Sequence, residues 1–365
     1  MSDILIVGGG IIGMLTAREL ALAGMKVTIV DQTEAGQESS WAGGGIISPL
    51  YPWRYPDAVS ALAKWGQQYY PELVDEMKAE TGLDAELLHN GLLILNCDEQ
   101  AEALAWARNW QPQMEIVDSK EILAIEPALS PALAGEGEAI WLATIPQVRN
   151  PRLVKVAKKY LLKQGVTFIE HTEIEAISHQ GNKVTGVRSR TGEIKADKVL
   201  IAGGAWSSNL LKNINISLDV APVKGQMILF KTLPGSIKRI VLSQDRYVIP
   251  RKDGRVLVGS TLEHTGFEKS ITIEAYNDLR SEAARIIPLL ADMEVEHHWA
   301  GLRPGSTNGI PYICAISEVE GLYVNTGHFR NGVVLGPASA RLMADIILSR
   351  EPILDIESYQ VGQAG

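Results

Sequence analysis

Two arginines near the carboxyl end of the chain have the chemistry to bind a small anion. Arg303 lies in Gly301–Gly305, and Arg330 lies in Gly327–Gly332. A guanidinium group can donate two parallel hydrogen bonds to a carboxylate, which binds the anion and fixes its orientation. Tyr247 is a third candidate, because a phenol can donate to the same carboxylate. These side chains predict a site for a small carboxylic acid; ion pairs within the protein are the alternative for either arginine.

The amino-terminal segment contains a pattern typical of dinucleotide binding. Gly8, Gly10 and Gly13 form Gly-x-Gly-x-x-Gly between the apolar run Ile4–Val7 and a helical pattern. The first glycine permits the tight turn, the second lets a pyrophosphate approach the helix N-terminus, and the third lets helix and strand pack closely. Asp31 ends the next predicted strand, where we expect it to accept hydrogen bonds from an adenosine ribose.

Glycine is enriched and clustered beyond this motif. The chain has 34 glycines in 365 residues, and three further groups are Gly43–Gly45, Gly203–Gly204 and Gly327–Gly336. Clustered glycine lets backbone approach a ligand closely. The last group precedes the final predicted helix, whose N–H groups and dipole suit an electron-rich ligand. For Gly43–Gly45, an ordinary flexible loop is the alternative.

The elements that must position these residues follow two patterns. Short apolar runs typical of a buried parallel sheet occur at the beginning, middle and end of the chain, whereas longer helices and hairpin-like strands are inserted between them. The first group of expected elements comprises strands at Ile4–Val7, Lys26–Val30, Val199–Ala202 and Leu322–Asn325 and helices at Met14–Ala23, Pro151–Gln164 and Pro337–Leu348. The inserted group comprises helices at Ala58–Glu80, Asp98–Arg108 and Ile273–Ile287, a strand at Leu92–Leu95 and a hairpin that turns at Lys252–Arg255.

Composition limits the classes of partner and compartment. Lys plus Arg is 34 and Asp plus Glu is 43, which gives a net charge of −9 and argues against binding to nucleic acid or anionic membranes. No apolar run approaches the roughly 18 residues of a membrane helix, and the first residues do not form an export signal. Cys97 and Cys314 are too few for a disulfide framework, and no clustered Cys/His pattern predicts a metal site. We therefore expect a cytoplasmic protein without a metal.

Over nearly its full length the sequence resembles the D-amino-acid oxidase superfamily of flavoproteins, and within it the glycine oxidase branch. Four segments carry the resemblance: Ile4–Gly13, Ser39–Ile46, Ala202–Trp206 and Gly327–Gly332. It implies FAD as the cofactor. It also implies noncovalent binding, because Leu302 stands where related sarcosine oxidases have the cysteine that links the flavin.

The interleaved patterns and the resemblance together predict an α/β fold class, with an FAD-binding Rossmann-like domain interleaved with an α+β substrate domain built on an antiparallel sheet. We expect the FAD-binding domain to comprise residues 1–45, 150–215 and 300–360. The substrate-binding domain is expected to comprise residues 46–149 and 216–299.

The resemblance also implies the site residues. Tyr247, Arg303 and Arg330 match the residues that bind the substrate carboxylate, and Leu262 stands where close family members have a methionine above the substrate. No catalytic side chain is expected. The residues implied to contact FAD are Gly8, Gly10, Ile11, Ile12, Gly13, Asp31, Gln32, Glu38, Ser39, Gly43, Gly44, Gly45, Ile174, Gly203, Gly327, His328, Phe329, Arg330, Asn331, Gly332 and Val333.

The implied reaction is oxidative deamination of glycine and other small amines, such as sarcosine and small D-amino acids. A hydride leaves the substrate Cα for flavin N5, dioxygen reoxidises the flavin, and the products are an imine or oxo acid, ammonia or an amine, and hydrogen peroxide. Orientation by the clamped carboxylate contributes most of the rate, so that no side-chain base is required. The resemblance further implies a homotetramer and a place near thiamine biosynthesis.

Several alternatives stay open at this point. A D-amino-acid dehydrogenase that passes electrons to a quinone, or a flavin module that modifies an amine on tRNA, would share the cofactor motifs. His328 either tunes the flavin or is a packed, hydrogen-bonded histidine. The aromatic loop Ser48–Pro56 either covers the site as a lid or packs as a structural loop.

Overall fold

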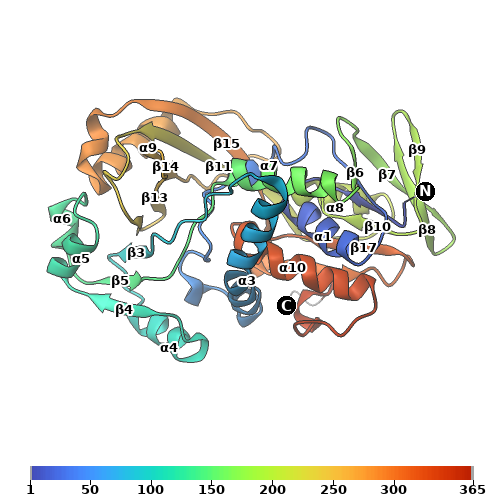
Figure 1. The fold of residues 1–365 in the computed structure, drawn as a ribbon, viewed down its shortest axis with the longest axis horizontal. Helices are drawn as coiled ribbons and strands as arrows, with labels where there is room; N and C mark the ends of the chain where they lie inside the picture. Colours follow the sequence, from blue (N-terminus) through green and yellow to red (C-terminus); the bar gives the residue numbers. More distant parts are fainter. Residues whose placement is uncertain (1, 363–365) are drawn as a thin grey trace.

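The computed structural model describes residues 2–362, which form two large β-sheets and one small sheet (Figure 1). The six-stranded sheet lies on the right of Figure 1 and the eight-stranded sheet on the left. Within residues 2–362, no helix is both long enough and apolar enough to cross a membrane.

The six-stranded sheet has the order β16-β17-β10-β1-β2-β6 and is parallel except for its edge strand β16. Its two central strands, β10 and β1, are short and entirely apolar because both faces are covered. Ile4 and Ile6 of β1 pack on the helical face, and Leu5 and Val7 pack on the opposite face. The strands are β1 (Ile4–Val7), β2 (Val27–Val30), β6 (Thr167–Ile169), β10 (Val199–Ile201), β16 (Tyr312–Ala315) and β17 (Leu322–Thr326).

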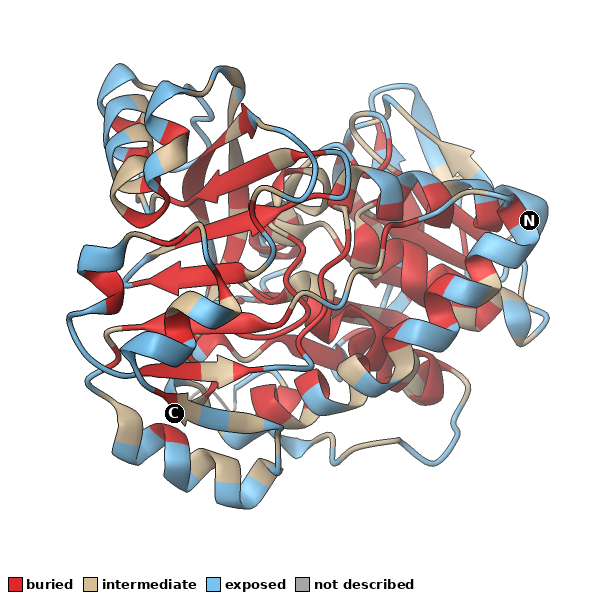
Figure 2. Cartoon of the chain, turned by 60° about the vertical axis from the view of Figure 1, so that its left-hand side comes forward, coloured by how far each residue is buried: buried red, intermediate tan, exposed pale blue. Residues whose placement is uncertain are grey.

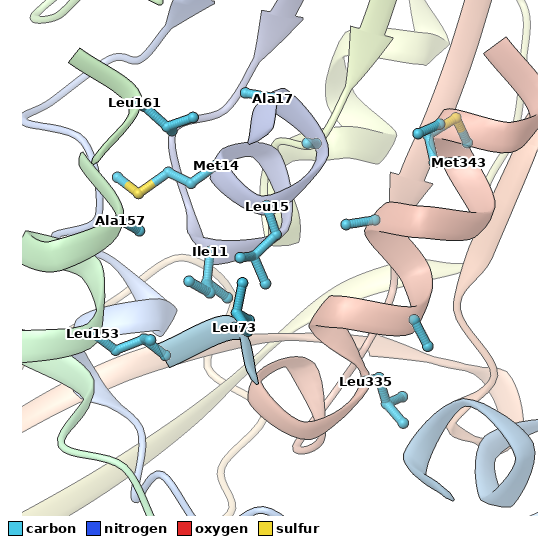
Figure 3. Close-up of a cluster of buried hydrophobic side chains, with 14 of the residues drawn as sticks. Ile11, Met14, Leu15, Ala17, Leu73, Leu153, Ala157, Leu161, Leu335 and Met343 are labelled. Atoms are coloured by element: carbon cyan, nitrogen blue, oxygen red, sulfur yellow. The ribbon is translucent and has the colours of Figure 1, made fainter. Parts of the chain in front are cut away.

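Four helices form the covering layer on one face of this sheet. Figure 3 shows the apolar cluster in which Met14 and Leu15 of one helix meet Leu153, Leu73 and Leu335 of the other three. The helices are α1 (Ile11–Leu22), α3 (Asp57–Thr81), α7 (Asn150–Lys163) and α10 (Gly332–Ile347). The opposite face is covered by the small sheet of β7 (Ile174–Gln180), β8 (Lys183–Ser189) and β9 (Gly192–Lys195) and by α8 (Ser207–Lys212).

The eight-stranded sheet has the order β15-β11-β14-β13-β12-β3-β5-β4 and is antiparallel except between β12 and β3. One face packs on α9, α5 and α6, and its strands are largely buried (Figure 2). The strands are β3 (Leu92–Leu95), β4 (Met114–Val117), β5 (Ala139–Leu142), β11 (Val220–Lys231), β12 (Ile240–Ser243), β13 (Arg246–Pro250), β14 (Arg255–Gly259) and β15 (Val295–Ser306). The remaining α-helices are α2 (Ser39–Ala42), α4 (Gln100–Trp110), α5 (Ser119–Ile125), α6 (Pro131–Ala134) and α9 (Ile273–Ile286).

The predicted fold class is confirmed, and the hairpin that turns at Lys252–Arg255 is the β13–β14 pair. The start of the last helix is different from the prediction. Helix α10 begins at Gly332 and contains Pro337. Proline has no N–H to donate to the carbonyl four residues earlier, and the hydroxyl of Tyr70 donates to that carbonyl, Val333 O, at 2.8 Å. A partner from α3 therefore compensates for the proline.

Candidate active site

One cavity is lined by strand ends and loops from both large sheets. Val7 and Val30 contribute from the parallel sheet, and Met227 and Tyr247 contribute from the antiparallel sheet. The N-terminal ends of α1 and α10 also reach it, through Ile11 and Gly332 among others. Because ligands of open parallel sheets bind at the carboxyl ends of the strands, the cavity lies where the glycine motif predicts a nucleotide.

The glycine motif between β1 and α1 forms one wall. Gly8 has φ of +114°, and a Cβ atom there would lie 2.3 Å from the carbonyl oxygen of Ala202. Gly8 and Gly10 line the cavity. Gly13 lies behind the loop, where a Cβ atom would be 2.1 Å from the oxygen of Gly8, so its part is to let the helix pack on the strand.

The first turn of α1 retains a free donor at this wall. The N–H of Ile11 donates to Ser40 Oγ at 2.8 Å. The N–H of Ile12 has no acceptor within residues 2–362. An unpaired donor at a helix N-terminus suits an anionic oxygen.

Asp31 lies at the end of β2 and lines the cavity together with Gln32. Its Oδ2 accepts from the N–H of Gly9 at 2.7 Å, and its Oδ1 accepts from the N–H of Thr33 at 2.9 Å. Burial raises the pKa of the Asp31 carboxyl, and the two N–H donors act in the opposite direction. Each carboxylate oxygen keeps capacity to accept a further hydrogen bond. Ile174 lines the cavity at the start of β7.

The segment from Glu38 to Gly45 forms the adjoining wall, and all five residues implied by the resemblance line the cavity there: Glu38, Ser39, Gly43, Gly44 and Gly45. The Ser39 hydroxyl donates to the carbonyl of Leu302, and Glu38 forms an ion pair of 2.9 Å with Lys269. These contacts tie the segment to β15 and to the loop after β14. Gly203, at the end of β10, also lines the cavity.

The loop before α10 contributes His328, Phe329, Arg330, Gly332 and Val333. The N–H groups of Gly332 and Val333 have no acceptor within residues 2–362. The other two implied residues of this loop, Gly327 and Asn331, do not line the cavity.

His328 is buried, and its Nε2 lies 3.0 Å from Ser339 Oγ. Burial lowers the pKa of its imidazole to about 3. The ring is therefore neutral at neutral pH, which favours the hydrogen-bonded, packed role among the two that the sequence left open.

The three candidates for carboxylate binding all line the same cavity: Tyr247 from β13, Arg303 from β15 and Arg330 from the loop before α10. Arg303 is held in place by Ser260 Oγ at 2.6 Å and by the carbonyl of Thr261 at 3.2 Å. Burial lowers the pKa of Arg303, Tyr247 raises it and Arg330 lowers it. An arginine nevertheless stays charged in a protein.

Neither arginine has a carboxylate of the protein within ion-pair distance among residues 2–362. Arg330 is only partly exposed, and its side chain makes no hydrogen bond within residues 2–362. Two guanidinium groups that face one cavity without a counter-ion favour an external anion there. The alternative of structural ion pairs is thus not what the structure shows.

The sequence interpretation missed part of the lining. Ser40, Trp206, Gly225 and Met227 line the cavity. Ser40 and Trp206 lie in segments that carry the resemblance, whereas no local pattern marks Gly225 and Met227, because β11 reaches the site only through pairing with β15. Leu262 was expected above the substrate, and this is wrong: its side chain is about half exposed and does not line the cavity. The loop after β14 turns this residue outward.

Side chains of the aromatic loop Ser48–Pro56 hold it against the rest of the protein by hydrogen bonds. The Tyr51 hydroxyl donates to the carbonyl of Gln244 at 2.7 Å, and Trp53 Nε1 donates to Glu99 at 2.6 Å. Only Ser48 and Leu50 of this loop line the cavity. These contacts support the structural role of the loop.

The residues that line the cavity are suited to bind a dinucleotide that contains a flavin. The wall contains glycines, of which Gly8 and Gly45 have no room for a Cβ atom beside the backbone, free N–H donors at two helix ends, and an acceptor at Asp31. The family model for the FAD-dependent oxidoreductases (DAO) matches residues 3–346. The chain belongs to this family. FAD is therefore its cofactor, and the buried Cys97 and Cys314 do not line the cavity, as noncovalent binding requires.

Members of this FAD-dependent oxidoreductase family with closely related sequences include a glycine oxidase of Pseudomonas aeruginosa. It is 51% identical over 357 residues, which cover 98% of this chain and 97% of the relative. The bifunctional protein ThiO/ThiG of a Synechocystis species is 30% identical over 96% of this chain and 52% of its own length. The crystal structure of glycine oxidase from Geobacillus kaustophilus superposes with a TM-score of 0.94 at 28% identity, covering 99% of this chain and 98% of that one.

Proposed function

We propose that this protein is an FAD-dependent glycine oxidase, which oxidises glycine and other small amines and releases hydrogen peroxide. The observation that carries the proposal is the pair Arg303 and Arg330, two cations without a protein counter-ion that face the cavity beside the proposed flavin wall. The relative from Pseudomonas aeruginosa, a glycine oxidase at 51% identity, supports the same activity.

The chain's own residues bind and orient the substrate. Arg303 and Arg330 pair with the carboxylate, and the Tyr247 hydroxyl donates a further hydrogen bond to it. Clamping one end of a small amino acid limits the directions in which its Cα–H bond can point, and such orientation lowers the barrier without a side-chain base. His328 is held neutral by burial and therefore supplies no charge to the substrate.

When bound, FAD accepts two electrons from the substrate and passes them to dioxygen. The balanced reaction for glycine consumes one water and one dioxygen and yields glyoxylate, ammonia and hydrogen peroxide. The walls of the cavity are largely apolar or backbone, and Met227 lies beside Tyr247, with 3.9 Å between Sδ and the phenol oxygen. This environment limits access of water while the C–H bond breaks.

We propose Gly8, Gly10, Ile11, Ile12, Asp31, Gln32, Glu38, Ser39, Gly43–Gly45, Ile174, Gly203, His328, Phe329, Arg330, Gly332 and Val333 as the FAD-contacting set, with Gly13, Gly327 and Asn331 acting through the backbone behind it. The proposed domains remain residues 1–45, 150–215 and 300–360 for FAD and residues 46–149 and 216–299 for the substrate. The long strands β11 and β15 connect the two parts, and α3 packs on α7 and α10 although it lies in the second range.

The setting of the reaction is also proposed. Two unpaired, buried cysteines suit the reducing cytoplasm. The relatives that carry a ThiO/ThiG fusion support a place in thiamine biosynthesis, and a homotetramer remains the expected assembly.

The test is anaerobic addition of glycine, sarcosine and D-alanine to the purified protein while the flavin absorbance is followed. Bleaching, followed by recovery in air with release of peroxide, supports an oxidase. Bleaching that persists in air would instead indicate a dehydrogenase. If no small amine bleaches the flavin, the proposed function is wrong.

A further inference from the structure

A third arginine contacts the cavity wall from behind. Arg251 directly follows β13 and is 8% exposed. It has no carboxylate within ion-pair distance among residues 2–362; the nearby acids Glu86 and Asp253 pair with Arg149 instead. Burial lowers the pKa of Arg251 to about 10, so its guanidinium is charged at neutral pH. A buried cation that is paired only with neutral acceptors is costly, which calls for an explanation.

The acceptors of Arg251 belong to the glycine loop and to the segment that backs it. Nη2 donates to the carbonyl of Gly44 at 2.7 Å, and Nη1 donates to Gln147 Oε1 at 2.5 Å and to the carbonyl of Val148 at 3.0 Å. The N–H of Val148 in turn donates to the carbonyl of Gly45 at 2.8 Å. The carbonyls of both lining glycines are therefore bound by the protein.

The N–H groups of the same two glycines are left available. Gly44 and Gly45 line the cavity, and their N–H groups have no acceptor within residues 2–362. The Gly44 carbonyl and the Gly45 N–H group belong to the same planar peptide unit, so holding that carbonyl sets the direction of that N–H group. Arg251 therefore determines how the loop presents the Gly45 donor.

The same strand face also holds the candidate substrate residue. Tyr247 and Ile249 lie on one face of β13, and Arg251, the residue after its last one, continues this alternation. A Cβ atom on Gly44 would lie 3.3 Å from Tyr247 Cε2 and 2.9 Å from Ile249 Cδ1. Gly44 therefore lies against β13 and the residue that follows it, close to the ring of Tyr247.

We propose that Arg251 is a positioning residue for bound FAD: it fixes the Gly44 carbonyl so that the Gly45 N–H group, which shares that peptide plane, faces the cofactor. This inference rests on the proposed position of the flavin beside Gly43–Gly45. The charge of Arg251 lies one hydrogen bond behind the loop, where it favours the negative charge that the cofactor gains on reduction.

The test compares three variants. Arg251→Met keeps the length of the side chain and removes the charge and the donors, whereas Arg251→Lys keeps the charge and loses the fork. Arg239→Met is the matched control, because Arg239 also donates to two backbone carbonyls, of Ile125 at 3.3 Å and Asn90 at 3.2 Å, and does not line the cavity. The readouts are the FAD dissociation constant of the apoprotein, the flavin midpoint potential and the apoprotein melting temperature.

We expect Arg251→Met to weaken FAD binding by about tenfold or more and to make the midpoint potential more negative. Arg251→Lys should weaken FAD binding while it keeps the wild-type potential, and Arg239→Met should change only the melting temperature. An FAD affinity and potential of Arg251→Met equal to those of Arg239→Met would overturn the inference. If Arg251→Met does not fold, an unchanged FAD affinity in Arg251→Lys would overturn it.

These readouts do not depend on turnover of glycine. A wild-type protein that binds FAD but oxidises no small amine would overturn the proposed function and leave the role of Arg251 to be decided by the FAD affinities.

Discussion

The proposed cofactor wall of the cavity is made of backbone, whereas the proposed substrate wall is made of side chains. On the first, glycines and the N-terminal ends of α1 and α10 offer N–H groups. On the second, Tyr247, Arg303 and Arg330 converge from two strands and a loop. Each wall is proposed to bind an anionic group. The cofactor wall uses the partial charges of N–H groups at close approach, whereas the substrate wall uses the full charges of two arginines.

The difference has a physical reason. A pyrophosphate is bound well by several weak donors that a single turn can supply, provided that no side chain blocks the approach. A small amino acid has few atoms, so its orientation needs strong, directional contacts from more than one side. This explains how a chain with a net charge of −9 can bind two anionic groups: the positive potential is local.

The largest effect is expected where a side chain would enter the backbone wall. Gly10→Val places a branched side chain at the surface that faces the cavity, and the backbone of Gly10, with φ of −72°, tolerates it. We expect FAD binding to weaken by roughly 100-fold, about 2.8 kcal/mol, as measured by titration of the apoprotein. Gly135→Val is the control, because Gly135 has an ordinary φ of −81° and lies away from the cavity. Full FAD content in Gly10→Val would contradict the backbone wall.

Removal of a charge from the side-chain wall should affect the substrate and not the cofactor. Arg330→Ala should raise KM for glycine by about 10- to 100-fold, since a charge-assisted pair contributes about 1.5–3 kcal/mol. Because Arg330 has no ion pair among residues 2–362, the melting temperature should not change. Steady-state kinetics decide this, with the exposed Arg350→Ala as the control. An unchanged KM would refute the carboxylate assignment.

A smaller effect is expected from the neutral member of the same wall. Tyr247→Phe removes one hydroxyl and should raise KM for glycine about fivefold, corresponding to about 1 kcal/mol for one hydrogen bond. Tyr323→Phe, on β17 and away from the cavity, is the matched control. If kcat falls and KM stays the same, the phenol acts in the reaction step and not in substrate binding.

The smallest effect concerns pH and His328. Its pKa is about 3 in the folded protein against an ordinary value of 6.5, so the unfolded chain binds the extra proton as the pH falls below 6.5. The free energy of unfolding therefore decreases with falling pH, and between pH 7 and pH 6 the contribution of His328 is about 0.7 kcal/mol.

Denaturant unfolding of the apoprotein at these two pH values checks this expectation. His328→Gln should lose that part of the pH dependence, and the exposed His264→Gln should keep it. Equal pH dependence in the two variants would show that His328 is not held neutral by burial.

Three features show how much of the structure could be predicted from the sequence. The β13–β14 hairpin was predicted because a polar turn with glycine separates two apolar runs, and it is confirmed. The sequence predicts that the last helix starts at Pro337, yet α10 begins at Gly332, and Tyr70 of another helix donates to the carbonyl that the proline leaves without a partner. Leu262 was misplaced for the same kind of reason: the direction of a loop depends on distant partners.

The sequence by itself determined the backbone wall, because the spacing of Gly8, Gly10 and Gly13 and the place of Asp31 are local properties of one turn and two strands. Only the tertiary structure decided the side-chain wall and its support. Pairing of β11 with β15 brings Arg303 to the cavity, and the approach of Arg251 to Gly44 spans 207 residues of chain. Such contacts arise from sheet register and burial, which no short pattern of residues encodes.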